Sequence, residues 1–169
     1  MTPRRFLCAA SFAYGEGSTS WHRVEAIRRL GHQVSFVDTT PPVTLRMGQL
    51  ILVRAANKYL GLRVDWGRVN QQLTKQIEQN EFDALWIDKG TDLKPSVFHA
   101  FKRRFPQGKI IGYSPDDMMV AANKSRLFMA TLPYYDTFFS TKSFHLEELK
   151  RLGCKRVRFV DNGFDERIH

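Results

Sequence analysis

Short apolar runs recur along the chain, and amphipathic stretches separate them. Each run is rich in β-branched or aromatic residues and is bounded by glycine, proline or polar residues, which is typical of a buried strand. The runs predict strands at Arg5–Ala10, Val34–Asp38, Ala84–Asp88, Lys109–Tyr113, Thr137–Thr141 and Val157–Val160. The stretches between them predict helices at Ser20–Leu30, twice within Thr44–Asn80, and at Ser96–Phe105, Ser125–Leu132 and Ser143–Leu152.

This alternation of strands and helices predicts the architecture. Near-continuous apolar strands are typical of a parallel sheet covered on both faces, because each right-handed crossover places a helix over the sheet. We therefore expect a Rossmann-like, three-layer α/β/α domain with a mainly parallel sheet of about six strands. Arg28–Val34 and Lys150–Val157 support this expectation, since each contains a basic last helical turn, a glycine C-cap and the start of a strand.

The composition agrees with one globular domain. The chain has 169 residues, of which 43% are apolar and 25% charged, so it can bury one core and does not resemble a disordered chain. Cys8 and Cys154 lack paired spacing and the five histidines are scattered, so neither a disulfide nor a metal site is expected. No apolar stretch approaches the roughly 20 residues that span a bilayer, and a reducing cytoplasm is the simplest compartment.

The net charge of +9 is the most distinctive global property. It favours an anionic partner such as a nucleic acid, a phospholipid or a phosphorylated substrate. Nucleic acid is disfavoured, because the sequence has no helix-turn-helix pattern, zinc-finger spacing or aromatic RNA-binding motif. Residues 44–63 predict a basic amphipathic helix, which suits either an ordinary surface helix or peripheral contact with an anionic membrane.

The first candidate site follows the first predicted strand, because ligands bind beyond the carboxyl ends of the strands in an open parallel sheet. Here a glycine-rich turn leads into a helix whose N–H groups suit an anion, and its residues are Gly15, Glu16, Gly17, Ser18 and Thr19. The turn lacks the third glycine of a dinucleotide fingerprint and the Gly-Lys-Ser/Thr step of a Walker loop. It is therefore either a phosphate cradle or a tight turn with a hydroxyl side chain as helix cap.

Asp38 keeps a second interpretation open. It ends the second predicted strand about 20 residues after the glycine-rich turn, where an NAD-binding protein has its ribose-binding acid. An NAD-dependent oxidoreductase is thus one alternative function. The incomplete glycine motif and the lack of a hydride-transfer constellation count against it.

Two further candidates follow the third and fourth predicted strands. Lys89 and Gly90 come directly after the third, where the lysine could pair with a phosphate or, alternatively, with a neighbouring aspartate. Asp116 and Asp117 follow the fourth on a proline-fixed turn. One of these two carboxylates could bind sugar hydroxyls or act as a general base, and the alternative is a turn that one aspartate caps.

Several phrases taken together resemble a known family. In order, they are GSTSWHRVEAIRRLGHQVSFVD, FDALWIDKG, KIIGYSPDDM, YYDTFFSTKSFHLEELKRLG and RVRFVDNGFDERIH. They are similar to the N-terminal domain of GT-B glycosyltransferases, especially the CgeB-like group related to spore maturation proteins. The resemblance covers nearly the whole chain, and the order and spacing of the phrases make it more specific than any single phrase.

The resemblance implies a division of labour between two domains. Residues 1–161 would be the acceptor-side domain, residues 162–169 with Asn162 would begin the interdomain linker, and the donor-binding domain would be absent from this chain. Gly15, Gly17 and Ser18 match the loop that approaches the donor diphosphate, and Asp116 and Asp117 match the paired acids after the fourth strand. The isolated chain would then be inactive.

The expected function is transfer of a glycosyl unit from a nucleotide-sugar to a saccharide, lipid-linked or protein acceptor. The nucleotide-sugar would be a co-substrate, with no tightly bound cofactor, and the protein would act in the cytoplasm or at the inner face of the membrane. Inverting and retaining mechanisms both stay open. The alternatives are a non-catalytic module that binds an anionic ligand and the NAD-dependent oxidoreductase.

Overall fold

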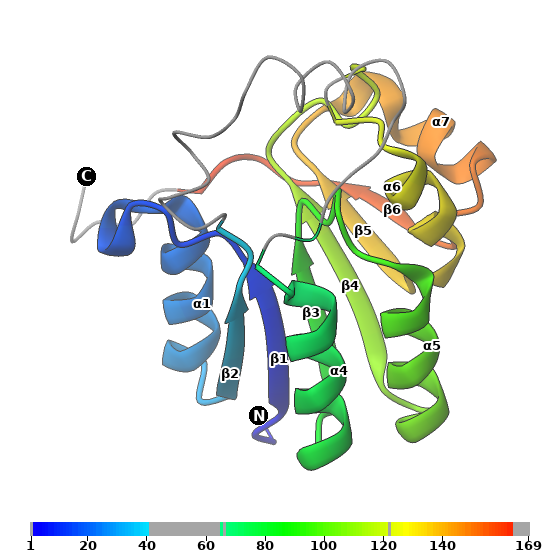
Figure 1. Ribbon diagram of the computed structural model, residues 1–169. Helices are drawn as coiled ribbons and strands as arrows, with labels where there is room; N and C mark the ends of the chain where they lie inside the picture. The colour runs from blue at the N-terminus through cyan, green and yellow to red at the C-terminus, as the bar shows by residue number, and fades with distance from the viewer. Residues whose placement is uncertain (1, 41–64, 66, 122, 164–169) are drawn as a thin grey trace.

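A computed structural model of the chain describes residues 2–40, 65, 67–121 and 123–163. It confirms the predicted fold class: a single sheet of six parallel strands in the order β2-β1-β3-β4-β5-β6, with helices packed against it (Figure 1). The strands are β1 (Arg5–Ala10), β2 (Gln33–Asp38), β3 (Ala84–Asp88), β4 (Lys109–Ser114), β5 (Thr137–Ser140) and β6 (Val157–Phe159).

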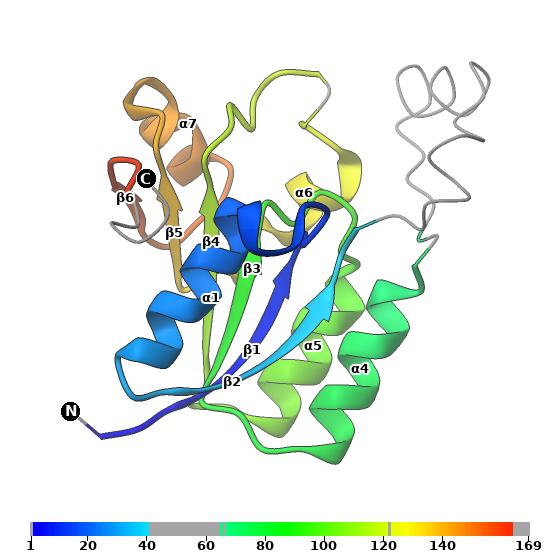
Figure 2. The same ribbon diagram turned by 90° about the vertical axis from the view of Figure 1, so that its left-hand side faces the viewer.

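The helices fall where the amphipathic stretches predict them. The α-helices of the described residues are α1 (Thr19–Arg29), α4 (Val69–Gln79), α5 (Pro95–Arg104), α6 (Arg126–Thr131) and α7 (Leu146–Arg151). Three short 3-10 turns accompany them: η1 (Gly15–Gly17), η2 (Leu132–Tyr134) and η3 (Ser143–His145). Figure 2 shows α1 on one face of the sheet and α4 and α5 on the other, as the expected layers require.

One predicted helix is divided. The sequence predicts one helix over Ser143–Leu152, but η3 and α7 share this stretch and His145 separates their conformations, with φ −123° and ψ 18°. These angles lie outside the helical region, so the chain turns at this residue instead of continuing a regular helix. The turn has a consequence for the site, because it directs the His145 side chain into the interior, where only 3% of it is exposed.

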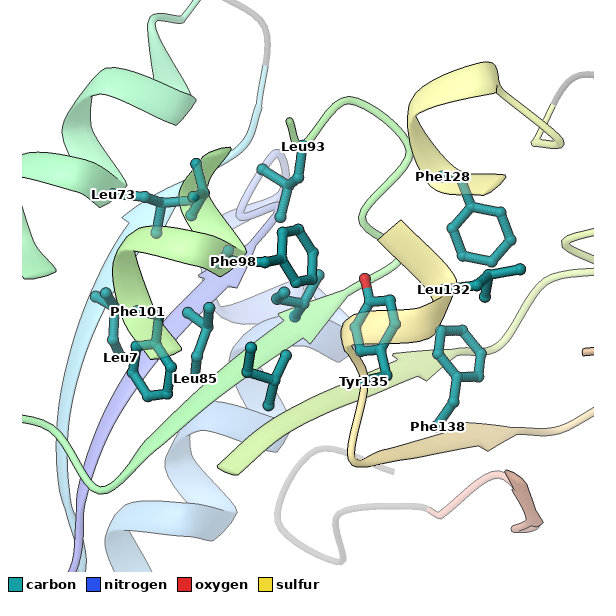
Figure 3. Close-up of a cluster of buried hydrophobic side chains, with 14 of the residues drawn as sticks. Leu7, Leu73, Leu85, Leu93, Phe98, Phe101, Phe128, Leu132, Tyr135 and Phe138 are labelled. Carbon is teal, nitrogen blue, oxygen red and sulfur yellow. The ribbon is translucent and has the colours of Figure 1, made fainter. Parts of the chain in front are cut away.

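The main core lies between the sheet and the helices of the α4 and α5 face. Alternate strand residues such as Leu7, Leu85 and Ile87 point into it, as the period of two in a strand requires. Figure 3 shows Tyr135 between Phe98 and Phe138, and the Tyr135 ring meets both in edge-on contacts with centroids 5.3 Å apart. Aromatic packing of this kind stabilises the domain beyond simple burial of area.

Gly112 in the middle of β4 makes room for these rings. A Cβ atom at this position would lie 2.3 Å from Cδ2 of Phe138, a separation that packed atoms do not tolerate. A glycine inside a strand weakens it slightly, but here it permits close approach of neighbouring side chains. The bulky ring and the missing side chain therefore complement each other across the β4–β5 pair.

The strand order reverses direction at β1. The chain passes from β1 to β2 on one side and then crosses back to β3 on the other side of β1. Ligands of open α/β sheets bind at such a switch point, outside the carboxyl ends of the strands. The segments that follow β1, β3 and β4 therefore define the place to look for a site.

Candidate functional site

The glycine-rich turn after β1 is exposed, but most of its amides are already engaged. The N–H groups of Gly15, Gly17 and Ser18 donate to the carbonyls of Phe12, Tyr14 and Gly15 at 2.9–3.1 Å. Ser18 occupies the N-cap position of α1, yet its hydroxyl donates to the carbonyl of Ser11 and does not cap the helix. An anion bound here would therefore contact the first turn of α1, which begins at exposed Thr19, instead of the loop amides.

Asp38 fastens this turn to the end of β2. Its Oδ1 atom accepts hydrogen bonds from the N–H of Phe12 at 3.1 Å and the N–H of Thr40 at 2.8 Å. Thr40 also accepts a hydrogen bond from the Phe12 N–H through its hydroxyl. Asp38 therefore has a structural task at the end of β2, through one of its two carboxylate oxygens.

A buried ion pair marks the switch point. Asp88, the last residue of β3, has a side chain only 5% exposed, and its Oδ2 accepts from Nη2 and Nε of Arg23 on α1 at 2.6 and 3.0 Å. The Arg23 guanidinium also lies over the Tyr113 ring, 4.3 Å from its centroid. Burial raises the pKa of Asp88 in spite of Arg23, and burial likewise raises the pKa of Tyr113. Buried groups with perturbed pKa values beside a charged partner are common in functional sites.

Lys89 and Gly90 follow this pair in an unusual backbone conformation. Both have positive φ, 68° and 58°, which is uncommon for a lysine. A Cβ on Gly90 would lie 2.7 Å from Cγ2 of Ile87 and 2.8 Å from the hydroxyl oxygen of Tyr135, so both space and conformation demand glycine. The turn directs the Lys89 ammonium to the Asp116 carboxylate, where Nζ and Oδ2 are 2.7 Å apart.

The two adjacent aspartates after β4 have different surroundings. The Asp116 side chain is 46% exposed and faces Lys89. Asp117 instead accepts a hydrogen bond from the N–H of Met119 at 2.7 Å, and its Oδ1 lies 3.4 Å from Nδ1 of His145. The turn interpretation therefore describes Asp117, while the Asp116 side chain stays accessible to solvent.

The structure thus joins some of the predicted site residues and leaves others apart. Lys89 and Asp116 form one ion pair, which the sequence analysis had not matched to each other. Asn162 lies exposed beyond β6, and Glu16 is exposed in η1. Residues 44–63, the predicted amphipathic helix, lie outside the described residues. The predicted roles of Asn162, Glu16 and residues 44–63 stay predictions.

Sequence reasoning missed Arg23, Tyr113 and His145. Arg23 is one of several basic residues on α1, and its position in the helical pattern does not distinguish it from a solvent-exposed arginine. Tyr113 reads as an ordinary strand residue, and His145 as one of five scattered histidines. Only the fold brings Arg23 over Tyr113 and against Asp88. Within the part of the chain that the structure describes, no three His, Cys, Asp or Glu side chains gather as a metal site.

Comparisons with known proteins give a likeness of structure and not of sequence. No protein-family model matches the chain, and no curated protein matches it. Among solved structures, the chain is similar to an "alpha-glucosyltransferase in complex with UDP-glucose and DNA containing an abasic site", with a TM-score of 0.57 and 16% sequence identity. The match covers 98% of this chain and 44% of that chain, so the 169 residues span less than half of that protein's length.

This likeness concerns the fold. The chain shares its arrangement of strands and helices with part of a glycosyltransferase, which agrees with the fold that the sequence resemblance implied. The CgeB-like group stays a prediction. None of the helices in the described residues combines the length and apolar character that crossing a membrane requires.

Proposed function

We propose that the chain is the acceptor-side domain of a glycosyltransferase that uses a nucleotide-sugar donor. The observation that carries the proposal is the polar cluster at the switch point of a glycosyltransferase-like fold: Arg23 with Asp88, and Lys89 with Asp116. Such a cluster offers positive charge for a phosphate and a carboxylate for hydroxyl groups. A donor-binding domain beyond residues 162–169 would complete the site, and this chain by itself would be inactive.

The Lys89–Asp116 pair suggests how the two substrates would meet. The side chains of Lys89 and Asp116 are 43% and 46% exposed, so a ligand can reach the pair and replace one partner at little cost in free energy. A phosphate that pairs with Lys89 would release the Asp116 carboxylate. The freed carboxylate would then accept the proton of an acceptor hydroxyl as it attacks the anomeric carbon, if the enzyme inverts configuration. Asp116 is therefore our first candidate for the general base.

The ligand class is tested by thermal stability of the full gene product, which would contain the proposed donor-binding domain. We expect UDP-glucose, other nucleotide-sugars or nucleoside diphosphates to raise the midpoint of unfolding, since a ligand that binds only the native state stabilises it. Lys89→Gln should abolish the increase. Lys150→Gln is the matched control, because Lys150 also forms an exposed ion pair, with Glu147, but lies on α7. Stabilisation by NAD(H) alone would favour the oxidoreductase.

The catalytic role is tested on the full gene product, including any sequence beyond His169. With a nucleotide-sugar and a panel of saccharide acceptors, Asp116→Asn should reduce turnover by about 10²-fold or more, as expected for loss of a general base. Glu147→Gln is a control at an equally polar surface position. Turnover equal to the wild type would exclude Asp116 as the base. Binding of nucleotides without any transfer would instead support the non-catalytic module that binds an anionic ligand.

Peripheral membrane contact through residues 44–63 and a cytoplasmic location belong to the same proposal. The net charge of +9 supports contact with an anionic surface. Flotation of the chain with vesicles that contain anionic lipid tests it, with zwitterionic vesicles as the control. Absence of retention on the anionic vesicles would remove the membrane from the list of partners.

A further inference from the structure

His145 is buried without a hydrogen bond in the described part of the chain. Its side chain is 3% exposed, and neither ring nitrogen has a hydrogen-bond partner there. Burying a polar group without a partner costs stability, and most buried polar groups in proteins are therefore paired. An apolar residue of similar size would avoid this cost. The imidazole therefore needs an explanation other than packing.

The ring approaches one of the predicted site residues, Asp117. Nδ1 of His145 lies 3.4 Å from Oδ1 of Asp117, slightly beyond the usual hydrogen-bond distance. A small movement of either segment would convert this approach into a hydrogen bond or an ion pair. Phe144 contacts the imidazole edge-on, with ring centroids 4.7 Å apart.

Asp117 in turn organises the segment that follows β4, residues 115–121. Its Oδ1 accepts from the N–H of Met119 at 2.7 Å, and its backbone carbonyl accepts from Nδ2 of Asn123 at 2.7 Å. Thr141, at the end of β5, adds a hydrogen bond from its hydroxyl to the carbonyl of Pro115 at 2.9 Å. The segment after β4 is therefore tied to the segment that carries His145 on both sides of Asp116.

We propose that His145 is a positioning residue that acts through Asp117 to hold residues 115–121 and thereby places Asp116 opposite Lys89. Asp117 faces the buried imidazole, and its partly exposed neighbour Asp116 meets Lys89 at 2.7 Å. The inference deepens the proposed function, on which the role of the Lys89–Asp116 pair rests. The anchoring itself is independent of that function.

Amide hydrogen exchange of the 169-residue chain tests the anchoring without any ligand. His145→Leu removes the ring nitrogens, and His145→Asn keeps an N–H donor close to the position of Nδ1. We expect His145→Leu to accelerate exchange in residues 116–121 about tenfold, because the Asp117 carboxylate loses the imidazole as its close polar neighbour. His145→Asn should restore most of the protection. Exchange in α4 and α5 should be unchanged in both variants, because these helices lie apart from this contact.

A double-mutant cycle with Asp117→Asn distinguishes positioning through Asp117 from simple packing. The double variant with His145→Leu should exchange no faster than the more affected single variant, since both changes break one interaction. Additive effects would overturn the proposal, and so would unchanged exchange in His145→Leu. Equal acceleration of α4 and α5 with no rescue by His145→Asn would also overturn it, because the histidine would then be a general packing residue.

A ligand measurement on the full gene product, which would contain the proposed donor-binding domain, separates this inference from the proposed function. If UDP-glucose stabilises the wild-type chain, His145→Leu should weaken that stabilisation and His145→Asn should recover it. If no nucleotide-sugar binds but the exchange results hold, the proposed function fails and the anchoring stands. If nucleotide-sugars bind equally well to all variants, His145 does not position the site and the inference fails.

Discussion

Asp136 and Asp88 lie at opposite ends of the parallel sheet and have opposite electrostatic surroundings. Asp136, at the amino end of β5, is held by three donors: Nζ of Lys102 at 2.7 Å, the N–H of Ile110 at 2.9 Å and Nζ of Lys155 at 3.4 Å. Burial opposes its ionisation, but these hydrogen bonds outweigh burial and lower the pKa of Asp136. At the carboxyl end of β3, burial prevails over Arg23 and raises the pKa of Asp88.

The difference agrees with the proposed site at the carboxyl end of the sheet. A carboxylate whose donors lower its pKa stabilises the fold, and Asp136 has the surroundings of a structural anchor. A buried carboxylate whose pKa stays raised in spite of a neighbouring cation is common in functional sites. The adjacent positive φ of Lys89 adds backbone strain at the same place. The carboxyl end is therefore the end to perturb.

The largest effect should come from breaking the buried pair at the carboxyl end. Arg23→Leu leaves Asp88 buried without its cation, which should lower the free energy of unfolding by about 3 kcal/mol at pH 7. Urea unfolding measures it. Arg104→Leu is the control, because Arg104 and Glu81 form an exposed pair, and its effect should stay within about 0.5 kcal/mol. If both variants lower the free energy of unfolding by a similar small amount, the pairing of Asp88 with Arg23 does not stabilise the fold.

Removing the anchor at the amino end should have the next largest effect. Asp136→Ala removes the acceptor of the Ile110 N–H and leaves Lys102 with only the carbonyl of Gly108, and should lower the free energy of unfolding by about 2 kcal/mol at pH 7. Glu81→Ala, at an exposed ion pair, is the control. Catalytic turnover and ligand binding should be unaffected by Asp136→Ala, because the residue lies at the other end of the sheet. A loss of ligand binding at constant stability would contradict the contrast between the two ends.

The pH dependence of stability should have opposite signs for the two carboxylates. The lowered pKa of Asp136 means that its contribution is present above the ordinary aspartate pKa of about 3.9 and is lost as pH falls through the folded-state value. The raised pKa of Asp88 means that its contribution is present below about pH 3.9 and is lost as pH rises through the folded-state value. The test is urea unfolding from pH 3 to 7. As the pH falls, the free energy of unfolding of the wild type should approach that of Asp136→Ala. As the pH rises, the free energy of unfolding of the wild type should fall relative to that of Asp88→Asn. Slopes of one sign would refute the comparison.

The smallest effect should be a gain in stability. Lys89→Gly removes the cost of a non-glycine residue at φ 68°, and should raise the free energy of unfolding by about 0.5–1 kcal/mol while it abolishes nucleotide binding. Stability from urea unfolding and binding from thermal shift check the two parts. Lys89→Gln is the control, and it should lose nucleotide binding without gaining stability. Lys150→Gly is unsuitable because Lys150 lies in helix α7, where glycine is itself destabilising.

Much of the fold follows from local patterns. The strands begin and end within one or two residues of the predicted positions, because each apolar run is bounded by turn residues that end a strand wherever it lies. The division at His145 is the clearest exception, since the sequence Ser143–Leu152 has helical periodicity throughout. There the tertiary surroundings override local propensity, and the backbone leaves the helical conformation at His145.

Candidate positions could also be predicted from the sequence, but not their partners. That polar residues after β3 and β4 would approach each other follows from the parallel sheet, whose carboxyl ends meet at one edge. Which lysine meets which aspartate depends on side-chain direction. Asp116 and Asp117 are chemically identical neighbours in the sequence, and only the packing of the segment after β4 against His145 gives them separate surroundings.

The sequence by itself determined the three-layer α/β/α class, the approximate bounds of the strands and the residues from which a site could be built. Periodicity and turn residues are local properties, and they act before any long-range contact forms. The tertiary structure alone decided that Arg23 would neutralise Asp88, that Lys89 would meet Asp116 and that Asp117 would turn inward to His145. These pairs join positions far apart in the chain, and their energies depend on distance and burial, which a sequence does not contain.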